Sequence, residues 1–189
     1  MVATCGPSWR RRAVVAPAGR SLGHHGVVTV KHATASTFVF GRRNDGWRIG
    51  LILHPLLGRL MIPGGHVEPH ESAPQAARRE VLEESGLHVR FLPAPSAATP
   101  PSIAASGRLV SPPWWIMEQP IAADNHLAEV HFHVDHLYVA LADDLTPVGA
   151  PAHPFGWHRA HELAGLHMFD DTRTLAAGLF TVLDDLTVA

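Results

Sequence analysis

The sequence predicts an α/β fold made of one domain, on three observations. Runs rich in β-branched and aromatic residues, which are typical of strands, fill the first part of the chain and resume after residue 113. Between them, residues 66–86 are charged and alanine-rich with helical periodicity. Near the C-terminus, Leu175, Leu179, Val182 and Leu186 recur at three- and four-residue spacings, which is the pattern of an amphipathic helix that packs on a core. The length of 189 residues is close to the usual size of a single domain.

The elements are predicted in a simple order. Residues 1–26 are rich in Arg, Gly, Ala and Pro without a sustained period, so we expect a flexible leader there and an ordered domain over 27–189. Strands are predicted at residues 27–30, 33–40, 47–53, 60–62, 89–92, 114–117 and 129–141. Turn residues at 41–46 predict a hairpin, and the Pro-, Ala- and Ser-rich residues at 93–113 predict a loop or lid. The closing helix is expected over 171–186.

Composition excludes several classes of protein. Fifteen Lys and Arg against 17 Asp and Glu give a formal net charge of −2, so the chain has no basic field for non-specific binding of a nucleic acid polymer. No stretch approaches the roughly 20 apolar residues of a membrane span, so we expect no membrane partner. The single cysteine, Cys5, excludes an intramolecular disulfide framework and fits a reducing compartment, so we expect a cytoplasmic protein.

Three carboxylates gather on one side of the first predicted helix. Glu80, Glu83 and Glu84 fall within an arc of roughly 100° on a helix of 3.6 residues per turn. Like charges at this spacing repel unless a cation binds between them, and Mg²⁺ prefers carboxylate oxygen. Arg79 lies four residues before Glu83, close enough to orient it. Taken alone, the pattern also fits the solvated face of an ordinary Glu-rich helix.

The residues around this helix belong to a longer motif. Its fixed positions are Gly65, Glu71, Arg79, Glu80, Glu83, Glu84 and Gly86, with hydrophobic Val81 and Leu87 at two further positions. This spacing resembles the Nudix box without departure. The order of elements over residues 27–186, with Trp157 followed by Glu162 near the end, is also similar to that of the Nudix hydrolase superfamily.

The resemblance implies a fold, an activity and a cofactor. The implied fold is an α/β/α sandwich around a central mixed β-sheet. The implied activity is Mg²⁺-dependent hydrolysis of the pyrophosphate linkage of a nucleoside diphosphate derivative by metal-activated water, with Mn²⁺ able to substitute. By resemblance, Glu80, Glu84 and the Gly65 carbonyl are metal ligands, Glu83 is a ligand or the catalytic base, and Arg79 orients Glu83.

The predicted strand over 129–141 has two different faces. Strict alternation places Glu129, His131, His133 and Asp135 on one face, and Val130, Phe132 and Val134 on the other, which we expect in the core. We predict that His131 and His133 line the substrate pocket on the side of the sheet that carries Glu80 and Glu84. A dedicated transition-metal site and a merely wet sheet face are the alternatives. Glu129 is a candidate base outside the box, because family members sometimes supply the base from elsewhere.

Two further side chains are candidate substrate contacts. Arg42 lies in the predicted hairpin turn and suits a phosphate, although a solvated turn is the ordinary setting of such a residue. Trp115 follows Trp114 on a strand, so the two rings point to opposite faces. One ring is expected in the core, and the other is expected to stack on a base or to form a homodimer contact.

The substrate stays open at this point, because the box binds the shared pyrophosphate whereas variable loops contact the remainder. Nucleoside triphosphates, ADP-ribose, nucleotide sugars, dinucleotides and prenyl diphosphates all fit the motif. The rival class is a non-catalytic Nudix ligand sensor, which the intact box and the lack of an evident helix-turn-helix segment disfavour. The isomerase branch of the superfamily uses a catalytic cysteine, and the only cysteine here lies in the leader.

Overall fold

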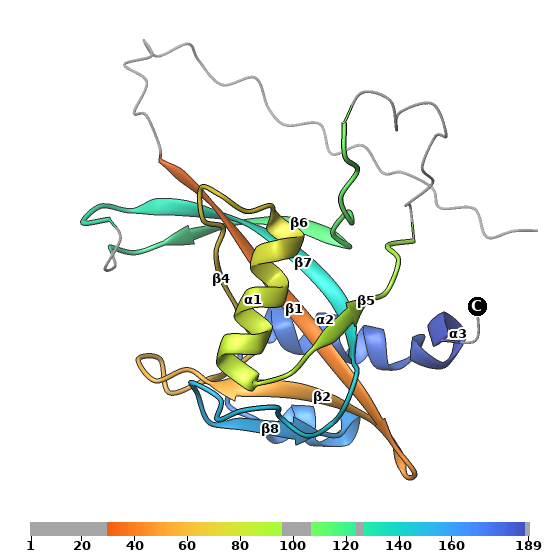
Figure 1. Cartoon of the computed structure of the whole chain (residues 1–189). Helices are drawn as coiled ribbons and strands as arrows, with labels where there is room; N and C mark the ends of the chain where they lie inside the picture. The colour runs from red at the N-terminus through yellow and green to blue at the C-terminus, as the bar shows by residue number, and fades with distance from the viewer. Residues whose placement is uncertain (1–29, 96–106, 124–126, 188–189) are drawn as a thin grey trace, which may run out of the picture.

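The computed structural model describes residues 30–95, 107–123 and 127–187 (Figure 1). Its elements are β1 (Lys31–Arg43), β2 (Gly46–Leu53), β3 (Leu60–Met61), β4 (Gly64–His66), α1 (Ala73–Ser85), β5 (Val89–Phe91), β6 (Trp115–Ile121), β7 (His131–Ala142), β8 (Phe155–His158), the 3-10 helix η2 (Ala160–Gly165), α2 (Asp170–Phe180) and α3 (Leu183–Thr187). The predicted leader, most of the predicted first strand and the middle of the predicted loop lie outside the described residues. Among the residues described, no helix is long and apolar enough to cross a membrane.

The strands form one eight-stranded mixed sheet. The order along it is β3-β2-β1-β7-β5, with β4 paired to β1, β6 to β7 and β8 to β2. The long central strands β1 and β7 run parallel, whereas the other pairings are antiparallel. On the edge of β1 away from β7, residues 34–36 pair with β4 and residues 39–43 pair with β2. This arrangement places the start of the box, which lies in β4, beside the first half of β1.

Helices cover both faces of the sheet, α1 on one and α2 on the other (Figure 1). Ala35 of β1 and Tyr138 of β7 pack in a cluster with Ala76 and Ala77 of α1. The opposite face is apolar as well and packs against α2 and α3 through Phe38, Phe40, Leu137, Val139, Leu141, Ala176, Leu179 and Leu183. Because side chains alternate along a strand, odd-numbered residues of β7 face the α2 side and even-numbered residues face α1. The architecture confirms the predicted α/β sandwich.

Helix α1 has clear signals at both ends. Ser72 precedes it, and both its backbone N–H and its hydroxyl donate to the Gln75 side-chain oxygen, at 2.9 and 2.8 Å. Pro74 lies in the first turn, where its missing N–H costs nothing. Gly86 ends the helix in the left-handed conformation, with φ 72°, which a residue without a Cβ adopts readily. The carboxylates of the box therefore lie on a helix whose length is fixed locally.

The C-terminal helix differs from the prediction. Instead of one helix over 171–186, the chain forms α2 and α3 with a turn between them. The Thr181 hydroxyl donates to the Gly178 carbonyl at 2.7 Å, and glycine and β-branched residues are weak helix formers, so the helix is interrupted here. The interruption shifts the buried face, since Leu183 is fully buried while Val182, expected in the core, is 37% exposed.

Candidate active site

Arg79 is the centre of the polar network formed by the box. Its Nε and Nη2 atoms donate to the two carboxylate oxygens of Glu71 at 3.2 and 2.8 Å. Nη1 donates to Glu80 at 2.7 Å and to Glu83 at 3.1 Å, and Nη2 also donates to the His66 carbonyl at 3.0 Å. The bidentate pair with Glu71 raises the pKa of Arg79 and lowers the pKa of Glu71. One guanidinium thereby fixes the positions of three carboxylates and of the backbone at the start of the box.

Glu80 and Glu84 carry negative charge into a half-buried position. Burial raises the pKa of Glu84, and the nearby charges of Glu80 and Glu83 raise it further. The Gly64 N–H, which donates to Glu84 at 2.9 Å, has the opposite effect and lowers this pKa, so that the resulting pKa is about 7. Burial also raises the pKa of Glu80, although Arg79 works against this. Burial makes the ionised form of a carboxylate unfavourable, and a bound cation stabilises that form. Buried carboxylates such as these are therefore well suited to bind a cation.

Gly65 has no room for a side chain. A Cβ atom built on it would lie 2.3 Å from Glu80 Oε1, so only glycine lets this carboxylate approach the backbone of β4. Gly64 is similarly close to Ser36 on the other side, where a Cβ would lie 2.4 Å from Oγ. Because neither glycine has a side chain, β4 can pair closely with β1 while Glu80 packs against it. The backbone of Gly65 and the carboxylate of Glu80 therefore share one small space.

The connection between β7 and β8 covers the C-terminal end of α1. The amides of Ala152 and His153 donate to the carbonyls of Glu83 and Glu84, at 3.0 and 3.4 Å, which satisfies groups that a helix end leaves without partners. His153 also places Nε2 3.3 Å from Glu84 Oε1. No sequence signal pointed to His153, because it lies far from the box along the chain. The structure adds it to the site.

The two candidate bases lie in different settings. The side chain of Glu83 is 57% exposed and is oriented by Arg79, so one oxygen is held while the group stays open to water. Glu129 is exposed just before β7, and its backbone carbonyl lies 3.0 Å from Nδ1 of His131. Of the two, Glu83 is the one that belongs to the network of the box.

The predicted pocket histidines belong to a cluster of four imidazoles. His131 is fully buried, and its ring centroid lies 5.2 Å from that of His133. His32 of β1 lies 5.1 Å from His131 and 6.4 Å from His133. His66, the residue after Gly65, lies 4.8 Å from His133 and 5.5 Å from His32. His32 and His66 were not among the predicted site residues, although His32, Thr34 and Ser36 alternate with Ala33 and Ala35 and could have pointed to His32.

The predicted faces of β7 need a correction. Val130 was expected in the core but is 66% exposed, and Phe132 and Val134 are only partly buried. His131 and Asp135 are the buried residues here, and Asp135 accepts from the hydroxyls of Thr34 and Ser36 at 3.0 and 3.1 Å. The histidines also lie on the α2 side of the sheet, opposite α1, and not on the side of the Glu80 and Glu84 helix as expected. Val130, Phe132 and Val134 are not buried because β6 and β7 extend past α1, and none of the described helices covers the even-numbered face there (Figure 1).

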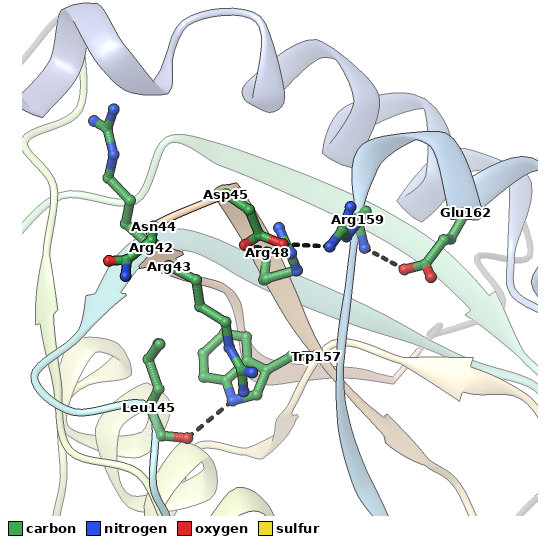
Figure 2. Close-up of a pocket in the computed structure, with 9 residues that line it drawn as sticks. All are labelled: Arg42, Arg43, Asn44, Asp45, Arg48, Leu145, Trp157, Arg159 and Glu162. Atoms are coloured by element: carbon green, nitrogen blue, oxygen red, sulfur yellow. Dashed lines mark hydrogen bonds and ion pairs between the residues drawn. The ribbon is translucent and has the colours of Figure 1, made fainter.

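Arg42 lies in another part of the molecule. A hollow of about 640 Å³ lies at the β1–β2 turn. The residues that line it are Arg42, Arg43, Asn44, Asp45, Arg48, Leu145, Trp157, Arg159 and Glu162 (Figure 2). Arg42 is seven residues beyond Ala35, the partner of Gly65, which is about 23 Å along a strand. Its Nη1 donates to Asp184 at 2.8 Å. The structure therefore does not bring Arg42 to the box.

Trp115 lies against the core. Its ring contacts Phe38 edge to face with centroids 6.3 Å apart, and Trp114 packs on the same cluster while donating to the Leu92 carbonyl at 3.1 Å. The two rings lie 5.7 Å apart and both pack on this cluster, so they do not point to opposite faces as expected, because Trp114 precedes β6 and is outside the strand alternation. Base stacking by Trp115 stays a prediction.

Comparison with known proteins assigns the fold independently. Residues 10–175 match the family model described as the NUDIX domain. A hydrolase of the NUDIX family from Clostridium perfringens is 21% identical with a TM-score of 0.60, covering 80% of this chain and 97% of that one. An Ap4A hydrolase from C. elegans is 13% identical with a TM-score of 0.55, covering 82% and 99%.

A third similar structure is the NUDIX domain of NrtR from Shewanella oneidensis in complex with ADP ribose. It is 16% identical, with a TM-score of 0.50, covering 85% of this chain and 94% of that one. No match was found among curated proteins. At these identities the solved structures establish the arrangement of sheet and helices, while the family model covers most of the chain.

Proposed function

Because this chain belongs to the Nudix family and is a hydrolase of pyrophosphate bonds, we propose that it cleaves a nucleoside diphosphate derivative with the help of Mg²⁺, for which Mn²⁺ substitutes. The observation that carries the proposal is the Arg79 network, which holds Glu71, Glu80 and Glu83 around one guanidinium. A solvated Glu-rich helix does not need a partly buried arginine with carboxylates on three sides.

The residues present fit a hard divalent cation. Glu80 and Glu84 are 14% and 12% exposed at their side chains, and burial raises the pKa of each, so both are stabilised in ionised form by a cation. The Gly65 backbone lies against Glu80, and its carbonyl is the further ligand that we propose. Oxygen donors of this kind suit Mg²⁺, and substrate phosphate and water complete its ligands. We assign Gly65, Glu80, Glu83 and Glu84 as this donor set.

We propose that Glu83, Arg79 and Glu71 carry out the proton transfer and the positioning that hydrolysis needs. The cation, when bound, neutralises charge on the diphosphate and acidifies water. Glu83, open to solvent on one side, accepts a proton from the attacking water, and Arg79 holds Glu83 in place for this transfer. The water oxygen bonds to phosphorus while the bridging P–O bond breaks and its electrons leave with the departing phosphate. Glu71 keeps Arg79 charged and oriented.

The substrate is proposed at the level of a class. An Ap4A hydrolase and a NUDIX domain in complex with ADP ribose are among the similar solved structures, so dinucleotides and ADP-ribose are the first compounds to test. The single cysteine continues to favour a cytoplasmic location, and the homodimer contact predicted for Trp115 is also retained as a proposal.

A substrate panel tests this function. The full chain is incubated with Mg²⁺ and each of a nucleoside triphosphate, ADP-ribose, a nucleotide sugar, a dinucleotide and a prenyl diphosphate, and the products are separated by chromatography. We expect mononucleotide products from at least one nucleotide, and a loss of at least about 10²-fold in turnover for Glu80→Gln. Glu118→Gln, which changes an exposed carboxylate on β6, serves as the matched control. Tight nucleotide binding without turnover would support the ligand-sensor alternative, and turnover of the prenyl diphosphate alone would move the substrate out of the nucleotide class.

A further inference from the structure

The histidine cluster has the composition of a transition-metal site. One ligand nitrogen from each of His32, His131 and His133 lies within 4.8 Å of the other two. A tetrahedral Zn²⁺ ion with Zn–N distances of about 2.1 Å separates its nitrogen ligands by about 3.4 Å. The three nitrogens thus need to approach by no more than about 1.4 Å, which rotation of imidazole rings provides without a change of backbone.

We propose that His32, His131 and His133 form a site for one divalent cation of the Zn²⁺ class, separate from the carboxylate site of the box. Imidazole nitrogen is the ligand that Zn²⁺, Co²⁺ and Ni²⁺ prefer, whereas Mg²⁺ prefers oxygen. Three protein ligands leave a fourth position for water or an anion, as in open zinc sites. The proposal does not depend on which substrate the enzyme hydrolyses.

The sheet supplies a rigid frame for these ligands. His32 and His133 are directly paired in the parallel ladder of β1 and β7. His131 lies two residues before His133 on the same strand, so its side chain points to the same face. All three rings therefore project from neighbouring positions of two central strands. Ligands on paired strands are held more closely in place than ligands on loops.

The contacts of His131 favour metal binding by its Nε2 atom. His131 Nδ1 lies 3.0 Å from the Glu129 carbonyl, which can only accept a hydrogen bond, so Nδ1 carries the hydrogen and the ring lone pair lies on Nε2. His131 is also fully buried, so its ring is held in place by the residues packed around it. The buried carboxylate of Asp135 lies two residues beyond His133 on the same face of β7.

The site adjoins the box through His66. Its Nε2 lies 3.4 Å from His32 Nδ1, and its carbonyl accepts from Arg79 at 3.0 Å. A metal bound by the three histidines is therefore separated from the Arg79 network by one residue of β4. We expect the loaded site to hold the first residues of β1 and β7 together.

Metal titration of the full chain tests the proposal. The protein is stripped with a chelator, excess Mg²⁺ is added to occupy oxygen sites, and Zn²⁺ binding is measured by calorimetry while Co²⁺ binding is followed by its visible ligand-field absorption. We expect one equivalent of Zn²⁺ that both His32→Gln and His133→Gln weaken at least about tenfold, and a tetrahedral Co²⁺ spectrum that both variants lose. His70→Gln, an exposed histidine outside the cluster, is the matched control and should keep both signals.

Two checks separate the outcomes. Melting curves of the metal-free variants establish that each is folded, and His32→Gln and His133→Gln lie on different strands, so the failure of one leaves the other to test the site. Glu84→Gln should retain the Zn²⁺ equivalent, since Glu84 belongs to the carboxylate site. Unchanged affinity in both histidine variants, equal loss in His70→Gln, or loss in Glu84→Gln would overturn the proposal.

Discussion

Replacing Glu84 by glutamine should stabilise the metal-free protein at alkaline pH while destroying its activity. The folded protein raises the pKa of this carboxyl from 4.5 to about 7 because the group is buried and lies near Glu80 and Glu83. A raised pKa in an acid means that the folded state binds the proton more tightly than the unfolded state. The free energy of unfolding therefore falls as the pH rises between about 4.5 and about 7.

The size of the effect follows from the shift. A difference of about 2.5 pKa units corresponds to about 3 kcal/mol at most, and structural relaxation and water penetration reduce this. Glutamine is uncharged and its amide oxygen can still accept from the Gly64 N–H. We therefore expect Glu84→Gln to be about 1–3 kcal/mol more stable than the wild type at pH 8 in EDTA, and nearly equal to it at pH 5.

Urea unfolding in EDTA at pH 5, 6, 7 and 8 measures this difference, with Glu118→Gln as the control for loss of an exposed carboxylate. Adding Mg²⁺ at pH 8 should then stabilise the wild type but leave Glu84→Gln unchanged, because the variant lacks a ligand. A variant that is less stable than the wild type at pH 8 in EDTA would refute the reasoning. It would mean that Glu84 forms a favourable structural ion pair in the absence of a cation.

Three further predictions concern the same site. Gly65→Ala should lower turnover at least about 10²-fold and lower the free energy of unfolding by about 1–3 kcal/mol, because the new Cβ would lie 2.3 Å from Glu80 Oε1. Gly178→Ala is the control: its Cβ meets open space, so stability in urea should change only slightly and turnover should stay the same. Arg79→Lys should lower kcat more than KM in steady-state assays, since a point charge cannot reproduce the fork that holds Glu71 and Glu80, and normal kcat would contradict the positioning role. EDTA should abolish turnover and Mg²⁺ or Mn²⁺ should restore it, whereas rescue by Zn²⁺ alone would contradict a carboxylate site.

The sequence predicts the box well because its determinants are local. The spacing of Glu80, Glu83 and Glu84 on one helix follows from helical geometry, whatever the rest of the chain does. The pairing of Arg79 with Glu71 does not follow from helical geometry, because Glu71 precedes α1. The contact of His153 with Glu84 could not be predicted, because it depends on the path of the loop between β7 and β8.

Strand β7 shows what the alternation of polar and apolar residues cannot predict. Alternation correctly places His131 and His133 on one face, but it does not say which face is covered. On β7 the odd-numbered face is polar from His131 to Asp135 and apolar from Leu137 to Leu141, and both parts are largely buried. Only the position of α1, which ends short of the first part of β7, decides that Val130 is exposed (Figure 1).

The backbone bonds between the β7–β8 loop and the end of α1 also have a practical consequence. The amides of Val148 and Ala152 donate to the carbonyls of Gly86 and Glu83, so their hydrogen exchange depends on how firmly the last turn of α1 is held. They are reporters that can be read without substrate, on the unmodified chain. Slower exchange at these two amides on adding Mg²⁺ would report that the carboxylate site is occupied. The same result would show that the β7–β8 loop is coupled to this site, so a tag or a deletion in the loop would disturb it.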